Sequence, residues 1–176
     1  MRRQVPCLAI VALLCCLEIS ATEADSDVAR VLQQFPGFHV VTTEERDPDT
    51  RAWITKHFPR SDASVVHADF DGDGHPDLAL LLKSDKSAAS KLVILLCPPA
   101  DQCRPAYQLD LGSVEGTYIT SVRAGSKVTE TEAEEDAAPP VRLKFTGIRL
   151  VYFEKAETVF YWNPERKQFK QIQTGD

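Results

Sequence analysis

Four aspartates fall within residues 69–78, the first three at alternate positions, and this segment constrains the fold more than any other. It reads Asp-Phe-Asp-Gly-Asp-Gly-His-Pro-Asp-Leu, and its acids are Asp69, Asp71, Asp73 and Asp77. No Lys or Arg lies within it. At a separation of about 5 Å and an effective dielectric of about 20, each pair of carboxylates costs roughly 3 kcal/mol. Gly74 permits a sharp turn here, between the apolar runs on either side.

The spacing of these acids is typical of a calcium site. Calcium binds six to eight oxygens, from flexible carboxylates and main-chain carbonyls, at about 2.3–2.6 Å. We predict that Ca²⁺ binds the side chains of Asp69, Asp71, Asp73 and Asp77 and the main-chain oxygen of His75. The alternative is a hairpin turn that uses Asp and Gly only for their turn propensity. Turns need one or two such residues, so strict alternation of acids favours the metal.

The segment resembles the calcium loop of FG-GAP or VCBS-type repeats, which occur in integrin alpha chains and in many bacterial exported proteins. Their pattern is DxDxDGxxDL, and all its ligand positions match. The EF-hand pattern does not match, because Leu80 stands where an acid is needed and an apolar strand, 78–82, follows instead of a helix. Such repeats normally build a β-propeller from several copies. This chain has one copy in 176 residues, as in small bacterial secreted proteins, so we do not expect a full propeller.

Residues 1–21 are predicted to be a signal peptide. Arg2 and Arg3 precede an apolar run, Val5–Leu17, and the small residues Ser20 and Ala21 follow it. An N-terminal core helix is the alternative, and Cys15 or Cys16 offers a second one, as a lipid-anchoring cysteine. The predicted location is therefore the periplasm or the cell exterior.

Two cysteines, Cys97 and Cys103, remain after such a leader is removed. Two cysteines in an exported chain are expected to form a disulfide. Redox or zinc chemistry is the alternative, but the intervening Pro-Pro-Ala-Asp-Gln is longer than the gap of a CxxC motif and has no histidine beside it.

The remaining sequence predicts an α+β fold, with two N-terminal helices leading into a mainly antiparallel β-sheet in one domain, residues 22–176. The first helix follows a possible cap at 25–27 and stops at Pro36-Gly37; the second begins at Asp47-Pro48 and stops before Pro59. Residues 125–140, which include the acidic run 130–136, are predicted to be a surface loop. The predicted strands are 38–42, 64–68, 77–83, 92–97, 107–111, 117–122, 141–145, 148–154, 158–162 and 169–173.

The formal net charge of −6 argues against a nucleic-acid or anionic-membrane surface, since both need clustered Lys and Arg. The sequence contains no HExxH, GxSxG, P-loop or Rossmann glycine motif. We therefore predict a non-enzymatic calcium-binding interaction module with a protein partner, for example an inhibitor or immunity protein of a periplasmic enzyme. The competing hypothesis is a small calcium-dependent hydrolase in which His67 or His75 acts with the loop carboxylates.

Overall fold

The computed structural model describes residues 19–59, 61–98, 102–131 and 139–175. The chain divides into two compact units, Met1–Pro36 and Gly37–Asp176. In the first unit, α1 spans Ile19–Leu32. It starts earlier than the predicted cap, because residues 19–24 contain no Gly or Pro that would stop a helix. The signal peptide stays a prediction: residues 1–18, with Cys15 and Cys16, lie outside the described residues.

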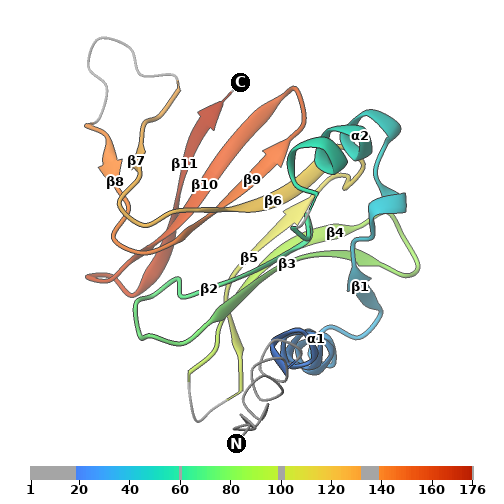
Figure 1. The fold of residues 1–176 in the computed structure, drawn as a ribbon, viewed down its shortest axis with the longest axis horizontal. Helices are drawn as coiled ribbons and strands as arrows, with labels where there is room; N and C mark the ends of the chain where they lie inside the picture. The colour runs from blue at the N-terminus through green and yellow to red at the C-terminus, as the bar shows by residue number, and fades with distance from the viewer. Residues whose placement is uncertain (1–18, 60, 99–101, 132–138, 176) are drawn as a thin grey trace, which may run out of the picture. The chain divides into compact units, whose positions relative to one another are not determined.

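The second unit begins with a short strand, a 3-10 turn and an α-helix (Figure 1). β1 spans Phe38–Val40, the 3-10 turn η2 spans Thr43–Glu45, and α2 spans Pro48–His57. Asp47 caps α2, since its side chain accepts hydrogen bonds from the N–H groups of Asp49 and Thr50. Pro48 follows as the first helical residue, where its missing N–H costs nothing. The two predicted N-terminal helices are thus confirmed.

The strands form antiparallel sheets, as predicted. The first sheet has five strands, in which β3 lies between β1 and β4, β5 follows β4, and β2 pairs with β3 beside β1. Its remaining strands are β2 (Val65–Ala68), β3 (Asp77–Ser84), β4 (Ser90–Leu96) and β5 (Arg104–Leu111).

The second sheet has four strands in the order β11-β10-β9-β6. They are β6 (Thr117–Val122), β9 (Gly147–Tyr152), β10 (Ala156–Asn163) and β11 (Gln168–Gly175). β7 (Lys127–Val128) and β8 (Val141–Arg142) pair antiparallel and form a separate two-stranded sheet. The predicted surface loop 125–140 therefore includes a short strand, while its residues 132–138 lie outside the described part. The described strands form neither a closed barrel nor a propeller.

The main core of the second unit lies where the two larger sheets contribute apolar side chains to one cluster. β3 and β4 supply Leu81 and Ile94, while β6, β9 and β10 supply Ile119, Leu150 and Phe160. Each of these five side chains is fully buried. Alternate residues of each strand point to the same face, so the period-two pattern of these strands places this set together.

A charged cluster surrounds His39 of β1. Its Nδ1 lies 2.6 Å from Asp85 Oδ1, and its Nε2 lies 3.0 Å from Glu45 Oε1. Hydrogen bonds to Asp85 and Glu45 raise the pKa of His39 above its usual 6.5. Burial raises the pKa of Glu45, but hydrogen bonds from the Thr42 N–H, Lys83 and His39 outweigh it and lower this pKa to about 2.

This cluster makes stability depend on pH. Because the folded pKa of Glu45 lies below its usual 4.5, its contribution is complete above pH 4.5 and is lost as pH falls toward about 2. The His39 contribution has the opposite sense: it is complete below pH 6.5 and is lost as pH rises through the raised pKa. We expect Glu45→Gln to lower the free energy of unfolding by about 1 kcal/mol at neutral pH, because solvent partly screens the ion pairs of Glu45 with His39 and Lys83. At pH 2 the substitution should have little effect.

Urea denaturation across a pH series measures this effect, with the exposed neighbour substitution Glu44→Gln as the control. Parallel pH profiles for wild type and Glu45→Gln would contradict the assignment.

Candidate metal centre

The candidate metal centre lies in the loop that joins β2 to β3. These strands pair antiparallel, and the pair of Ala68 with Asp77 closes the base of the loop. Gly72 and Gly74 both have positive φ angles, +86° and +87°, a conformation that side chains rarely adopt. The sequence predicted a turn at Gly74 but gave Gly72 no role. A Cβ at Gly72 would overlap the ring of Phe145, so glycine is required there by packing as well as by conformation.

Three of the predicted ligands converge. Asp69, Asp71 and Asp77 each offer a carboxylate oxygen, and these oxygens lie within 4.8 Å of one another, so the group could hold a metal ion. Loop N–H groups hold two of these carboxylates in place. Asp69 Oδ1 accepts from Gly72 N at 2.6 Å, Asp69 Oδ2 accepts from Gly74 N at 3.0 Å, and Asp71 Oδ1 accepts from Asp73 N at 3.1 Å.

Electrostatic repulsion within the loop is visible at Asp71. Burial raises the pKa of its carboxyl, and the charges of Asp73 and Asp69 raise it further, while a hydrogen bond from the Asp73 N–H opposes them. The described part of the loop contains no Lys or Arg that would relieve this repulsion. A cation among the carboxylates would relieve it.

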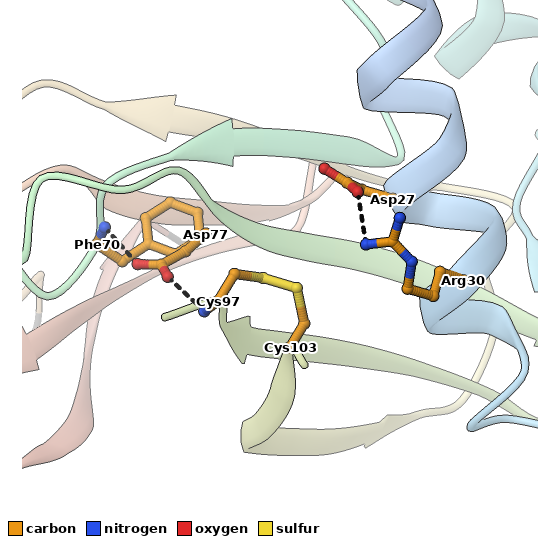
Figure 2. The surroundings of a disulfide bond; sticks show 6 residues. All are labelled: Asp27, Arg30, Phe70, Asp77, Cys97 and Cys103. Atoms are coloured by element: carbon orange, nitrogen blue, oxygen red, sulfur yellow. Dashed lines mark hydrogen bonds and ion pairs between the residues drawn. A yellow bond between two sulfur atoms is a disulfide. The ribbon is translucent and has the colours of Figure 1, made fainter. Parts of the chain in front are cut away.

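Asp77 is the buried member of the group, with 1% of its surface exposed. Figure 2 shows its carboxylate between two backbone donors: Oδ2 accepts from Phe70 N and Oδ1 from Cys97 N, both at 2.9 Å. Burial raises the pKa of this carboxyl to about 6, although the two N–H donors lower it. Asp77 thus ties the loop, through Phe70, to the end of β4, through Cys97.

The other two predicted ligands are not in this group. Asp73 is exposed, and its Oδ1 accepts a hydrogen bond from His75 N at 2.8 Å. This hydrogen bond forms a turn at residues 73–75, between Asp71 and Asp77. Binding of a metal by Asp73 and by the main-chain oxygen of His75 stays a prediction.

A disulfide joins Cys97 to Cys103, as predicted. It lies beside the metal centre, because the N–H of Cys97 is one of the two donors to Asp77 (Figure 2). A disulfide indicates an oxidising, extracytoplasmic compartment. Among the described helices, none is long and apolar enough to cross a lipid bilayer.

Of the two histidines of the hydrolase hypothesis, His67 lies on β2 before the loop and His75 lies within the loop. His67 is exposed on β2 and lines a cavity of about 560 Å³, whose lining also includes Asp62, Arg123 and Arg149. In the described residues, neither the His67 nor the His75 side chain makes a hydrogen bond to a carboxylate.

No family model, curated protein or solved structure matches the chain. The assignment of this centre therefore depends on its geometry and on the resemblance of residues 69–78 to the FG-GAP loop.

Proposed function

We propose that this chain is an exported calcium-binding protein that acts as an interaction module. Calcium would be held by the carboxylates of Asp69, Asp71, Asp73 and Asp77 and by the main-chain oxygen of His75. The observation that carries this proposal is the convergence of Asp69, Asp71 and Asp77 within 4.8 Å in a loop without Lys or Arg. Carboxylate oxygens of this kind suit a hard cation such as calcium.

The proposed role of calcium is structural. Asp77 accepts hydrogen bonds from Phe70, within the loop, and from Cys97, twenty positions further along the chain. A cation bound by Asp77 together with Asp69 and Asp71 would fix the loop against the end of β4, next to the disulfide. The bound cation would also offset the repulsion among the carboxylates. A rigid surface beside this loop is what an interaction module, such as an inhibitor of a periplasmic enzyme, requires.

Calcium-dependent thermal stability tests the metal site. Sites of this class in extracellular modules bind at about 10⁻⁴–10⁻³ M. Calcium at about ten times its Kd should therefore stabilise the protein by about 1.4 kcal/mol and raise Tm by about 5 °C. We expect the double substitution Asp71→Asn with Asp73→Asn to abolish this shift. Asparagine keeps the side-chain oxygens that accept from Asp73 N and His75 N, so the turns are preserved.

The matched control removes two acids from exposed positions away from the loop, Asp110→Asn with Glu165→Gln, and should keep the full shift. Equal melting temperatures of the wild type in chelator and in millimolar calcium would show that the site assignment is wrong.

A calcium-dependent hydrolase is the second candidate, and the position of His67 favours it. His67 lines the cavity of about 560 Å³ and stands two residues before Asp69. If His67 is a general base there, His67→Gln should abolish hydrolysis of a reporter ester or peptide while keeping the calcium-dependent melting shift. A wild-type protein without hydrolytic activity would leave the interaction module as the proposal.

A further inference from the structure

Two unpaired strand edges face each other beside the metal loop. Among the described strands, β2 pairs only with β3 and β6 pairs only with β9. β2 and β6 contact each other across the boundary between the two larger sheets (Figure 1). They are joined at one end, where the N–H of Ile119 donates to the carbonyl of Ala63 at 2.9 Å. Beyond this junction each strand keeps a free edge.

The hydrogen-bonding direction of each residue follows from the ladder. Leu81 N donates to Ser64 O, so Ser64 faces β3. Successive residues of an antiparallel strand point their backbone groups to opposite sides, and therefore Val65 and His67 direct their N–H and C=O groups away from β3. In β6, the N–H of Ile119 points to Ala63, so Ser121, two residues on, presents its backbone groups to the same side.

A cavity of about 560 Å³ lies along these edges. Its lining includes Val65, Val66 and His67 from β2, and Ile119 and Ser121 from β6. The volume falls within the range of about 300–1,000 Å³ that is typical of binding sites. The cavity thus combines a partly apolar lining with unpaired backbone donors and acceptors, which are the elements used in recognition by strand addition.

The charges of this cavity oppose those of the whole chain. Its lining contains two arginines, Arg123 and Arg149, and one acid, Asp62, which gives +1 with histidine neutral, whereas the chain carries −6. Arg149 Nε is buried and has no hydrogen-bond partner among the residues that the structure describes. Its closest ion-pair oxygen, Glu157 Oε2, is 3.6 Å away, which is too far for a hydrogen bond. The Arg149 side chain as a whole is 42% exposed, so its guanidinium offers a charge to an anionic group in the cavity.

We infer that this cavity binds an extended, acidic peptide segment of a partner protein. The segment would add as a strand along the free edges, pairing with the backbone of Val65, His67 and Ser121, while its carboxylates contact Arg123 and Arg149. This inference names the partner class of the proposed interaction module and rests on that proposal. The apolar lining of Val65 and Ile119 would accept its alternate, uncharged side chains.

Fluorescence anisotropy with a labelled peptide of alternating Glu and Val tests the inference, in saturating calcium. The acidic peptide should bind, and the matching peptide of alternating Lys and Val should not. Arg123→Glu and Arg149→Gln should each weaken binding about tenfold or more, since each removes a charge-assisted contact. Arg166→Glu, at an exposed position outside the cavity lining, is the control and should bind as wild type does.

Two further measurements separate strand addition from simple charge attraction. Ser121→Pro removes an N–H that faces the cavity but no hydrogen bond between β6 and β9, and β6 is an edge strand, so the protein should fold and lose binding. Bound peptide should slow hydrogen exchange at the amides of Val65, His67 and Ser121, whereas inorganic phosphate alone should not. Binding unaffected by both Arg123→Glu and Ser121→Pro, or protection that omits these amides, would overturn the inference.

Calorimetric calcium titration keeps the two proposals distinguishable. Wild type that binds calcium but not the acidic peptide contradicts the peptide site alone. Wild type that binds the peptide through these edges but shows no heat with calcium contradicts the metal site and leaves the peptide site standing.

Discussion

Replacing Arg46 with methionine is expected to lower the free energy of unfolding by about 3–4 kcal/mol. Arg46 is only 4% exposed, and its guanidinium joins separate parts of the second unit. Nε donates to Thr117 O at 2.8 Å, Nη1 to Thr42 O at 3.0 Å, and Nη2 to Ala63 O at 3.1 Å. Nη2 also donates to the hydroxyl of Ser64. Methionine fills the space of the aliphatic stem but leaves the buried carbonyl of Thr117 without its arginine donor and removes the hydrogen bonds to Ala63 O and to the Ser64 hydroxyl.

The electrostatics of Arg46 explain why its loss is costly. Burial lowers the pKa of the guanidinium, and the negative charges of Asp62 and Glu45 act against this effect. In the described part of the chain no direct ion pair holds this side chain, and its hydrogen-bond partners are neutral oxygens. The planar fork of arginine reaches several such acceptors at once, which a lysine ammonium cannot do with the same geometry.

Urea denaturation followed by circular dichroism measures the loss, with Arg166→Met as the exposed control, expected within about 0.5 kcal/mol of wild type. Arg46→Lys should be intermediate, because it keeps the charge but loses the fork. An Arg46→Lys protein as stable as wild type would show that the fork geometry does not matter.

The fold class was predictable because its signals are local. Asp47 followed by Pro48 indicates a helix start, and the structure has the cap and the first helical residue at these positions. Residues 117–122 were predicted as a strand and form β6 with the same bounds. The partition into three sheets was not predictable, since pairing depends on contacts between distant segments such as β6 with β9. Lys127–Val128 was missed because a two-residue strand has no detectable period.

Only the proximity of the carboxylates in the candidate metal centre was predictable, from their spacing along the sequence. Carboxylates so closely spaced in one turn are expected to lie near each other; Asp69, Asp71 and Asp77 do, whereas Asp73 does not join them. The donors that hold Asp77 were not predictable, because the Cys97 N–H reaches it only through the register of β3 against β4. The need for glycine at position 72 depends likewise on Phe145, a residue distant in sequence.

Replacing Asp77 with alanine is the second change with a large expected effect. The carboxylate accepts from Phe70 N and Cys97 N, so alanine leaves both backbone donors without this acceptor, and the Phe70 N–H is buried. An unsatisfied buried donor costs about 1–3 kcal/mol. We therefore expect Asp77→Ala to lower the free energy of unfolding by about 3 kcal/mol in chelator, where no metal contributes. In calcium the loss should be larger, by the stabilisation that bound calcium gives to wild type.

Comparing Asp77→Ala with Asp77→Asn separates the two roles of this carboxylate. Asparagine keeps one acceptor oxygen and removes the buried charge, so in chelator it should be more stable than alanine. In calcium both variants should lack the melting shift, because neither provides a carboxylate. Asp110→Ala, at an exposed position of β5, is the control and should change stability by less than about 0.5 kcal/mol. An Asp77→Asn protein that retains the full calcium shift would remove Asp77 from the ligand set and leave its role as the link between the loop and β4.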